Sequence, residues 1–466
     1  MADDRPTLDL SSRRRIHVTN AAGAGMSAVA VLLAQMGHEV SGHDPSSTSP
    51  FLIRLRELHI PVAAGPEGAL PDRADAVVVS TATPADHPDV VAARRRGLPI
   101  VHRSGALAAI CAQRRVAAVA GTHGKTTTSA LLATLLHGAG VAPGWVVGAR
   151  VGGLGASADW GGDGPLVVEA DESDGTFLAL GAEAAIVTNV EPDHLEHWGG
   201  EDALRQGFVD FVARLTGPAV LCLDDPGAAA LVPAAREPWT YGTAPGADYE
   251  LRDVSVEGTG VRFALHHADE VVQVSVPAAP GIHNARNAAG ALALAHRLGV
   301  PLEAGAAALA GFRGVARRFE VRGEVAGVVF VDSYDHLPTE ISAALAAARA
   351  GGWRRVVCCF QPHRYSRTAA LWRTFAHAFV DADRLVVTDV YPAGEAPRPG
   401  VSGKLIVDAV LDAHPWAEVA WMPSLDDASD YLAAVLRPGD LCLTLGAGDL
   451  TEVPDRVMAT LEAKAG

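Results

Sequence analysis

The feature that most constrains this chain is a strand, a glycine-bearing turn and a helix that follow one another between residues 116 and 137. The run VAAVA at 116–120 predicts a buried parallel strand, and the leucines of 129–137 repeat at helical spacing. The turn GTHGKTTT at 121–128 joins the two. A helix N-terminus presents free N–H groups and the positive end of its dipole, which favour a bound phosphate. The chain is therefore predicted to contain an α/β fold with an anion-binding turn.

The side chains of this turn suit a nucleoside triphosphate. Lys125 would contact the β- and γ-phosphates, and the hydroxyl of Thr126 would bind Mg²⁺. Only three of the chain's 38 lysine and arginine residues are lysines, so a lysine at this place indicates a need for an ammonium group. The generic phosphate loop carries one more glycine, where this chain has Val119, so a glycine-rich turn without a ligand is the alternative. The turn residues predicted to bind nucleotide are Gly121, Thr122, His123, Gly124, Lys125, Thr126 and Thr127.

The composition narrows the class of protein and its compartment. A net charge of −16 argues against a general nucleic-acid-binding protein, which would show a basic face. The polar residues 1–15 carry no apolar core segment, so we expect no secretory signal. We also reject 16–40 as a membrane span, because polar residues and glycines divide it. Five scattered cysteines without metal-ligand spacing are typical of small core residues in a reducing cytoplasm, where we place the protein.

Short apolar runs predict three consecutive α/β domains. We place a Rossmann-like domain at 1–113, a central P-loop ATPase-like domain with a mainly parallel sheet at 114–314, and a second Rossmann-like domain at 315–466. The alternating stretch 249–276 predicts an antiparallel strand pair within the central domain. Further strands are predicted at 16–19, 40–43, 76–80, 116–120, 166–170, 185–188, 219–223, 328–332, 356–360, 385–389 and 441–445.

A second glycine-bearing turn lies in the first domain. Gly23, Gly25 and Ala28 follow the first strand and satisfy the dinucleotide pattern G-x-G-x-x-A. Asp44 ends the second strand about twenty residues on, where that pattern has a ribose-binding acid. The pattern predicts a nucleotide site, and an NAD-dependent dehydrogenase is one interpretation. Close packing of a helix on a strand through small residues is the other.

Two acidic segments follow the phosphate turn in the central domain. The first, EADESD at 169–174, begins where a strand ends, so Glu169 is the first candidate for a magnesium ligand beside Thr126. The second, TNVEPDH at 188–194, ends the next strand in the same way. We predict a metal or phosphate role for the imidazole of His194. A solvated turn is the alternative for the first segment, and a structural histidine is the alternative for His194.

Taken together, these segments resemble the Mur ligase family over residues 16 to 450. GTHGKTT at 121–127, EADESD at 169–174 and NVEPDH at 189–194 occur in the order and rough spacing of that family. The short form of the phosphate turn is typical of this family, which accounts for Val119. Further motifs that carry the resemblance are GAGMS at 23–27, GIHNARN at 281–287, RRF at 317–319 and FQPHRYSR at 360–367.

The resemblance implies an ATP- and Mg²⁺-dependent ligase of peptidoglycan precursor synthesis. Such an enzyme phosphorylates a substrate carboxylate with ATP, and the amine of an amino acid then displaces phosphate from the acyl phosphate. Within the family, the likeness implies UDP-N-acetylmuramate and L-alanine as substrates, joined at the lactyl carboxylate. It implies neither a nucleic-acid partner nor membrane insertion, and we expect a monomer or a weak homodimer.

The resemblance also implies roles for individual residues. Lys125 would stabilise the transferred phosphoryl group. Thr126 and Glu169 would hold one Mg²⁺, and His194 a second metal ion. Because Lys125 and His363 lie in different domains, we expect the third domain to close on the second. Nucleotide contacts are implied for His283, Asn284, Asn287 and Arg318. Catalysis or binding of the amino acid and acyl phosphate is implied for Arg318, Asp332, His363, Arg364 and Arg367. Binding of the UDP-sugar is implied for Gly23, Gly25, Met26, Ser27, Asp44, Ser80 and Arg103.

Two segments depart from the family's usual pattern. Asn20 and Ala22 stand in the first turn where glycines are usual, which bears on UDP-sugar binding. Asp335 and Leu337 stand where the family has a small residue and an imidazole, near the amino-acid site. The alternatives are therefore a sister ligase or paralogue that uses a different amino acid, peptide or nucleotide sugar. A non-catalytic relative that binds nucleotide for regulation is a further alternative.

Overall fold

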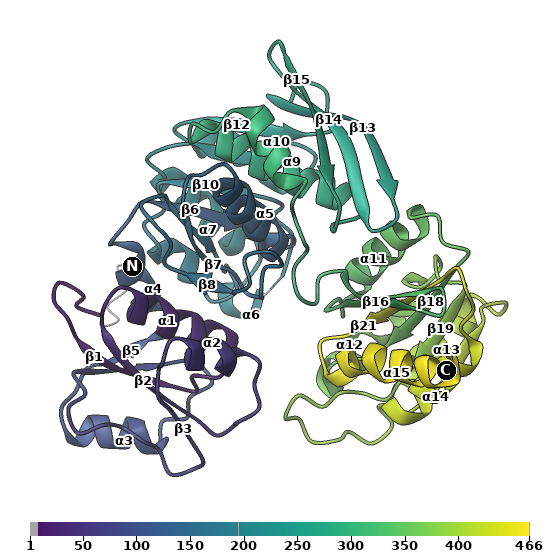
Figure 1. Cartoon of the computed structure of the whole chain (residues 1–466), viewed down its shortest axis with the longest axis horizontal. Coiled ribbons are helices and arrows are strands. Elements are labelled where there is room, and N and C mark those ends of the chain that lie inside the picture. The colour runs from purple at the N-terminus through teal and green to yellow at the C-terminus, as the bar shows by residue number, and fades with distance from the viewer. Residues whose placement is uncertain (1–7, 194, 466) are drawn as a thin grey trace. The chain divides into compact units, whose positions relative to one another are not determined.

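The computed structural model describes residues 8–193 and 195–465. The chain forms two compact units. The first contains residues up to 252 together with 265–272 and 286–311, and the second contains 253–264, 273–285 and the chain from 312 onward. Three sheets, with most of their strands labelled in Figure 1, confirm the predicted fold class of three α/β domains with mainly parallel sheets. The predicted boundaries after residues 113 and 314 stay predictions.

The N-terminal sheet has five parallel strands in the order β3-β2-β1-β4-β5. Strand β4 is the apolar run AVVV, which is typical of a parallel strand that is covered on both faces. Helix α1 follows the glycine turn and buries an unbroken run from Met26 to Leu33. The strands are β1 (Arg15–Thr19), β2 (Glu39–Asp44), β3 (Val62–Ala64), β4 (Ala76–Val79) and β5 (Ile100–His102). The helices are α1 (Ala24–Gln35), α2 (Phe51–Glu57), α3 (Pro88–Arg95) and α4 (Arg103–Cys111).

The central sheet has ten strands in the order β15-β14-β13-β12-β11-β10-β6-β9-β7-β8. Strand β6 lies between β9 and β10 and is parallel to both. The carboxyl ends of these three strands therefore meet at one edge of the sheet, where α/β proteins bind ligands. The strands are β6 (Val116–Ala120), β7 (Gly144–Val146), β8 (Ala158–Asp159), β9 (Leu166–Glu169), β10 (Ala184–Val187), β11 (Ala219–Cys222), β12 (Pro238–Gly242), β13 (Tyr249–Glu257), β14 (Gly260–His267) and β15 (Glu270–Val276). The helices are α5 (Lys125–Gly138), α6 (Leu195–Trp198), α7 (Glu201–Arg214), α8 (Pro226–Ala229), α9 (Ile282–Arg297) and α10 (Leu302–Leu309), with 3₁₀ turns at η1 (Thr176–Ala179) and η2 (Val232–Ala234).

The stretch 249–276 forms three strands rather than the predicted pair. Two-residue turns at 258–259 and 268–269 divide it, and their first residues, Gly258 and Ala268, have φ of 57° and 50°. Positive φ at such short turns is typical of tight connections between strands. Alternation of apolar and polar residues predicts strands in this stretch, but it does not give their number.

The C-terminal sheet has six strands in the order β16-β17-β21-β18-β19-β20, with β16 antiparallel to β17 and the other neighbours parallel. Alternate residues of its inner strands serve two cores. Val331, Cys358 and Leu443 pack with α11 and α13, while Phe330, Cys359 and Cys442 pack with α14 and α15. The strands are β16 (Glu320–Val325), β17 (Val328–Ser333), β18 (Arg355–Phe360), β19 (Arg384–Val387), β20 (Val419–Trp421) and β21 (Asp440–Leu445). The helices are α11 (Pro338–Ala350), α12 (Tyr365–Leu371), α13 (Lys404–Ala413), α14 (Leu425–Val435) and α15 (Val453–Ala465), with 3₁₀ turns at η3 (Trp372–His377) and η4 (Asp449–Glu452).

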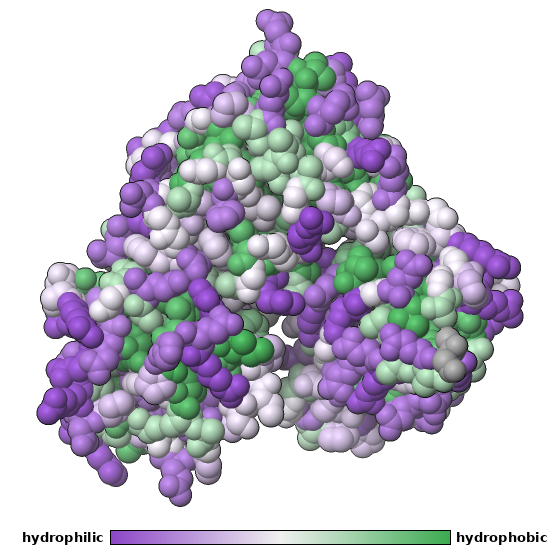
Figure 2. Space-filling view, viewed as in Figure 1, coloured by the Kyte–Doolittle hydropathy of each residue, from purple (hydrophilic) through white to green (hydrophobic). Residues whose placement is uncertain are grey.

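All five cysteines are buried and free, which confirms their predicted place in the core. Burial raises the pKa of the Cys111 thiol to about 12, and it raises the pKa of Cys358 and Cys359 above the usual range. The face seen in Figure 2 is largely hydrophilic, with apolar residues in separate patches. Within the described part of the chain, no helix combines the length and the apolar character that a bilayer crossing needs.

Candidate active site

The phosphate turn is packed so closely that two of its positions require glycine. Gly121 has φ 132°, and a Cβ there would collide with the hydroxyl of Thr188 just after β10. Gly124 has φ 82°, and a Cβ there would lie 2.9 Å from Oδ1 of Asn287 on α9. L side chains rarely adopt either backbone conformation. The two glycines thus let the turn pass beside Thr188 and Asn287 into the start of α5.

The segment that follows β10 holds the backbone of this turn. The N–H of His123 donates to Oδ1 of Asn189 at 2.7 Å, and Nδ2 of Asn189 donates back to the His123 carbonyl at 3.1 Å. The hydroxyl of Thr122 accepts from the N–H of Glu191 at 2.9 Å. Asn189 has a positioning role that the sequence did not assign, although a polar residue directly after a buried strand was the available signal. The turn is therefore fixed by its own side-chain partners, as a preorganised anion site requires.

Lys125 forms an ion pair with Glu172 over the turn. Its Nζ lies 2.7 Å from Oε2 of Glu172 and donates to the carbonyls of Gly121 at 2.8 Å and Thr122 at 3.1 Å. The Glu172 side chain is 2% exposed. Burial raises the pKa of Glu172 above its usual range, while the Lys125 ammonium opposes that rise. Glu172 is thus a positioning residue for Lys125 that sequence analysis missed, although it lies within the acidic segment that was singled out.

Thr126 and Glu169 are the predicted magnesium ligands that lie within the residues the structure describes, and their side chains are in contact. The Thr126 hydroxyl donates to Oε1 of Glu169 at 2.7 Å, and the N–H of Gly148 donates to Oε2 of Glu169 at 2.6 Å. Hydroxyl and carboxylate oxygens are the donors that Mg²⁺ prefers. The pair therefore brings a suitable donor set to the start of α5. The third predicted ligand, His194, lies outside the described residues.

The first turn of α9 places its predicted residues in different surroundings. Asn287 is 7% exposed and adjoins Gly124, as a nucleotide-binding role requires. Asn284 is equally buried and donates from Nδ2 to the carbonyl of Pro280 at 2.7 Å, next to His283 at the start of the helix. Arg286, which the sequence did not single out, donates to Oδ2 of Asp224 at 2.5 Å. Thr127 lies in the first turn of α5, beside the other predicted residues of the phosphate turn.

The N-terminal turn accommodates both of its departures from the family pattern. Asn20 has φ 51°, a left-handed conformation that asparagine tolerates better than most residues, and its carbonyl accepts from the N–H of Gly23 at 3.1 Å. Ala22 has no positive φ, and its N–H donates to Oδ2 of Asp44 at 2.8 Å. The other oxygen of Asp44 accepts from the N–H of Ser46 at 2.8 Å. Asp44 therefore holds the turn through both carboxylate oxygens.

The remaining predicted UDP-sugar residues lie at the same end of the N-terminal sheet. A Cβ on Gly25 would lie 2.6 Å from Nη1 of Arg103, so the glycine admits the guanidinium at the start of α1. Met26 and Ser27 are buried in the first turn of that helix. Ser80 follows β4 and is half-buried. These positions agree with the predicted grouping, and their contacts with a sugar nucleotide stay a prediction.

In the second unit, Asp332 is a buried anchor. It is 1% exposed, and its two oxygens accept from the hydroxyls of Thr444 at 2.7 Å and Thr451 at 2.6 Å. Nε of Arg317 lies 3.6 Å from Oδ2 of Asp332, and the guanidinium of Arg317 also donates to the carbonyl of Gly446 at 2.6 Å. The carboxylate thus ties β17 to the arginine pair before β16. Its neighbour Arg318 lies over the ring of Tyr334, 5.4 Å from the centroid.

A hydrogen bond from Arg367 decides which ring nitrogen of His363 carries the proton. Nη1 of Arg367 lies 2.9 Å from Nδ1 of His363, and because a guanidinium cannot accept, Nδ1 is the acceptor. Burial, together with the nearby His336 and Arg367, lowers the pKa of His363 to about 4. At neutral pH the ring is therefore uncharged, with its proton on Nε2. Arg364 precedes α12 at φ 68°, a strained conformation for a residue with a Cβ.

The altered segment 335–337 is a hydrogen-bonded turn before α11. The N–H groups of His336 and Leu337 both donate to Oε2 of Glu340, at 3.0 Å and 3.1 Å. The hydroxyl of Ser333 donates to Oδ2 of Asp335 at 2.7 Å. Burial and, to a smaller extent, the neighbouring Glu340 raise the pKa of Asp335 to about 6. His336 lies 5.7 Å from the His363 ring, so this turn borders the His363–Arg367 pair.

Comparison with known proteins identifies the family. Family models match residues 15–115 (Mur ligase family, catalytic domain), 165–295 (Mur ligase middle domain) and 317–448 (Mur ligase, glutamate ligase domain). A protein of Anaeromyxobacter sp. (strain Fw109-5) named UDP-N-acetylmuramate–L-alanine ligase is 44% identical over 452 residues, which cover 96% of this chain and 98% of the relative. The chain belongs to the Mur ligase family. The predicted family is confirmed.

Two solved Mur ligase structures share the fold over nearly the whole chain. The UDP-N-acetylmuramate–alanine ligase of Thermotoga maritima has a TM-score of 0.83 at 28% identity and covers 97% of this chain and 100% of its own. A murein peptide ligase of Psychrobacter arcticus 273-4 has a TM-score of 0.69 at 25% identity and covers 96% of this chain and 98% of its own. The fold of this Mur ligase is therefore similar over nearly its full length to that of each.

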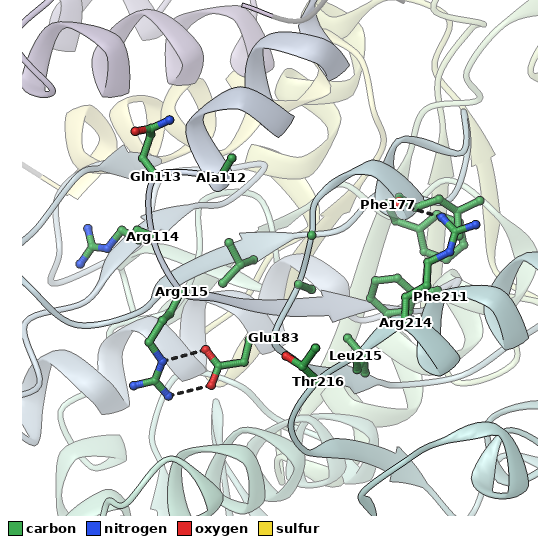
Figure 3. A pocket seen from close by; sticks show the side chains of 14 residues that line it. Ala112, Gln113, Arg114, Arg115, Phe177, Glu183, Phe211, Arg214, Leu215 and Thr216 are labelled. Atoms are coloured by element: carbon green, nitrogen blue, oxygen red, sulfur yellow. Dashed lines mark hydrogen bonds and ion pairs between the residues drawn. The ribbon is translucent and has the colours of Figure 1, made fainter. Parts of the chain in front are cut away.

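A pocket of about 610 Å³ lies at the opposite edge of the central sheet of this Mur ligase, away from the phosphate turn. Its lining includes Val116, where β6 begins, whereas the turn follows the end of that strand. Figure 3 shows Arg115 paired with Glu183 at its rim, where Nε of Arg115 lies 2.7 Å from Oε2. The pocket therefore contains none of the residues predicted to bind nucleotide.

The Lys125–Glu172 pair is expected to stabilise the fold measurably. In a double-mutant cycle of Lys125→Met and Glu172→Gln we expect a coupling of about 1–3 kcal/mol, because the pair is 15% and 2% exposed. The free energy of unfolding in denaturant measures it. The matched control is the Glu201–Arg205 pair, 46% and 47% exposed, with an expected coupling of about 0.3–0.5 kcal/mol. Equal couplings in the two pairs would contradict the positioning role of Glu172.

The N-terminal turn predicts different responses to glycine at its two unusual residues, because only Asn20 has positive φ. Asn20→Ala is expected to destabilise the protein by about 1–2 kcal/mol, because alanine tolerates positive φ poorly. Ala22→Gly is expected to cost about 0.5–1 kcal/mol, because this position has no positive φ and loses a buried methyl group. Asn20→Gly serves as the control and is expected to be close to neutral. A stabilising Ala22→Gly, measured by thermal unfolding, would be the contrary result.

The raised pKa of Asp335 predicts that the stability of the fold falls as the pH rises. Its folded pKa of about 6 exceeds the usual 3.8, so the folded state binds the extra proton between these values. Stability is then lost as pH rises from about 4 through 6. Asp335→Asn is expected to be more stable relative to the parent protein at pH 7.5 than at pH 4.5, as measured by thermal unfolding at both. If Asp335→Asn and the parent protein differ in thermal stability by the same amount at pH 4.5 and pH 7.5, the prediction is wrong.

Proposed function

We propose that the chain is an ATP-dependent ligase that joins L-alanine to the lactyl carboxylate of UDP-N-acetylmuramate in peptidoglycan precursor synthesis. The observation that carries the proposal is the 44% identity, over 96% of this chain, to a relative of that name. The solved structures support the same choice, since the alanine ligase has a TM-score of 0.83 and the peptide ligase 0.69. The packed phosphate turn around Lys125 supports the use of ATP.

The reaction has two steps that both concentrate negative charge. A carboxylate oxygen attacks the γ-phosphorus of ATP, the bond to ADP breaks, and an acyl phosphate forms. The amine of the amino acid then attacks the acyl carbon, phosphate leaves, and the amine loses a proton. Fixed cations and N–H donors around the phosphoryl group lower both barriers. Lys125, held by Glu172, and the N-terminus of α5 supply them in the first unit.

Thr126 and Glu169 are the residues that would hold Mg²⁺. Their oxygens lie 2.7 Å apart next to Lys125, and a hydroxyl with a carboxylate matches the ligand preference of this hard cation. When bound, the cation would neutralise charge on the phosphate oxygens. The metal role of His194 stays a prediction.

The second unit carries the residues suited to the amino acid. Arg364 and Arg367 are cations that can pair with a carboxylate in the two-pronged manner of guanidinium groups. His363 is uncharged at neutral pH and offers Nε2–H as a hydrogen-bond donor. His363 is therefore a neutral hydrogen-bond donor, in addition to the two cationic arginines.

The family models favour a UDP-sugar site over an NAD-dependent dehydrogenase in the N-terminal domain, because residues 15–115 match the Mur ligase family. Asp44 does not separate the two interpretations. Its oxygens accept from the N–H groups of Ala22 and Ser46, and each keeps a second lone pair for a ligand hydroxyl. A dehydrogenase would also give no role to the ion pair of Lys125 and Glu172 in the phosphate turn.

Release of phosphate tests the proposed reaction. With ATP, Mg²⁺ and UDP-N-acetylmuramate, a colorimetric phosphate assay is expected to respond most strongly to L-alanine among a panel of amino acids. Lys125→Ala is expected to lower kcat by about 10²–10³-fold, because it removes a fixed cation beside the phosphoryl group. Lys404→Ala is the matched control, since that lysine is exposed and pairs with Asp408.

The outcomes separate the alternatives. Turnover that needs a peptide in place of an amino acid would assign the chain to a sister ligase. A response to another amino acid would trace to the altered segment at Asp335 and Leu337. No stimulation by UDP-N-acetylmuramate with any amino acid would refute the proposed substrate. Wild-type turnover equal to that of Lys125→Ala would indicate a non-catalytic relative.

A further inference from the structure

Three histidines and one aspartate are buried together in the N-terminal sheet. His17 lies on β1 and His43 on its neighbour β2, while His87 and Asp89 stand at the start of α3. Their exposed fractions are 0%, 1%, 9% and 1%. Imidazole and carboxylate groups are rarely buried unless they are paired or bind a metal. None of the four belongs to the phosphate turn or to the residues proposed to bind UDP-sugar.

One carboxylate oxygen is the centre of this cluster. Oδ2 of Asp89 lies 3.3 Å from Nε2 of His17, 3.4 Å from Nδ1 of His43 and 3.8 Å from Nδ1 of His87. Ligand atoms of His43, His87 and Asp89 all lie within 4.8 Å of one another. Such separations let one ion touch all three residues at ordinary metal–ligand distances of about 2.0–2.2 Å.

The protonation of His43 argues for a cation at this point. Nε2 of His43 is 2.6 Å from the carbonyl of Gly65, which only accepts, so Nε2 carries the hydrogen. In the neutral ring Nδ1 is then a bare lone pair, and it faces an oxygen of Asp89 with no hydrogen-bond partner. Two acceptors 3.4 Å apart in a buried place repel each other unless a cation lies between them.

The surroundings hold the carboxylate as metal sites hold their ligands. Oδ1 of Asp89 accepts from the N–H groups of Ala69 at 2.7 Å and Leu70 at 2.8 Å, which leaves Oδ2 directed at the histidines. His17 contacts the same Oδ2, and its other ring nitrogen lies 2.9 Å from the hydroxyl of Ser41. Outer hydrogen bonds of this kind orient the ligands of protein metal sites. The N–H of Asp89 also lies 3.3 Å from Nδ1 of His87, a long hydrogen bond that a metal bond can replace.

We propose that His43, His87 and Asp89 bind a divalent transition-metal ion of the Zn²⁺ type, with His17 orienting the carboxylate. Two imidazoles and one carboxylate match the ligands of Zn²⁺, whereas Mg²⁺ and Ca²⁺ prefer oxygen donors alone. The ion links β2 to α3 and stabilises the fold, because it binds the folded state alone. His43 directly precedes Asp44, so the ion also fixes the end of β2 that supports the N-terminal turn.

Metal content of the full chain tests the proposal. The protein is made with a histidine-free tag, equilibrated with Zn²⁺ in the presence of excess Mg²⁺, freed of unbound metal and analysed by mass spectrometry of the elements. We expect about one Zn²⁺ per chain, and with Co²⁺ the intense visible absorption of a four-coordinate site. Glu169→Gln is expected to keep both signals, because it alters only the predicted magnesium ligand.

Matched double variants locate the ion. His43→Gln with His87→Gln is expected to lose the bound metal and its protection against thermal unfolding. The control, His377→Gln with His414→Gln, removes two imidazoles that contact each other in the second unit and is expected to keep both. If the first variant does not fold, the wild-type stoichiometry and Co²⁺ spectrum decide alone. Folded wild-type protein without stoichiometric Zn²⁺ would overturn the proposal and leave a proton between His43 and Asp89. Equal loss of metal in both double variants would overturn it as well.

Discussion

The buried ion pair between Lys125 and Glu172 is the interaction on which the phosphate turn depends. Lys125 begins α5, while Glu172 follows β9, so the pair ties a helix to the loop of a neighbouring strand. The bond from Thr126 to Glu169 ties the same two elements a second time. Lys125 and Thr126, the first two residues of α5, thus contact Glu172 and Glu169. One glutamate fixes an ammonium group, and the other presents a carboxylate where a cation can join it.

Sequence patterns predict those parts of the fold and the site that follow from local order or from a general rule of sheet topology. The strand at 116–120 is predicted by its run of apolar residues. The contact between Thr126 and Glu169 is predicted because the carboxyl ends of parallel strands meet at one edge of the sheet. The roles of Glu172, Asn189 and Glu340 were not predicted. The roles of Glu172 and Asn189 depend on which polar groups face each other across elements that are distant in sequence, and a single chain does not display that register. Glu340 contacts the N–H groups of His336 and Leu337 just before it, so its role is local and a capping pattern was the available signal.

The departures from the family pattern show how a turn tolerates substitution. Asn20 takes the left-handed conformation, so only this position needs the freedom of a glycine, whereas Ala22 is an ordinary residue whose N–H contacts Asp44. The altered segment near Leu337 is likewise closed by its own bonds to Glu340. In both places the backbone keeps its hydrogen bonds while the side chain changes. Substitution there alters what a ligand would touch more than it alters the fold.

The burial of all five thiols has a practical consequence. A thiol whose pKa is raised by burial forms little thiolate, and the thiolate is the species that reacts with alkylating probes. A cysteine introduced at an exposed position would therefore react with such probes much faster than the five native cysteines. Fluorophores or spin labels could be attached at one chosen point of each unit without first removing native cysteines. Spectroscopy on such labels would test the predicted closure of the third domain on the second.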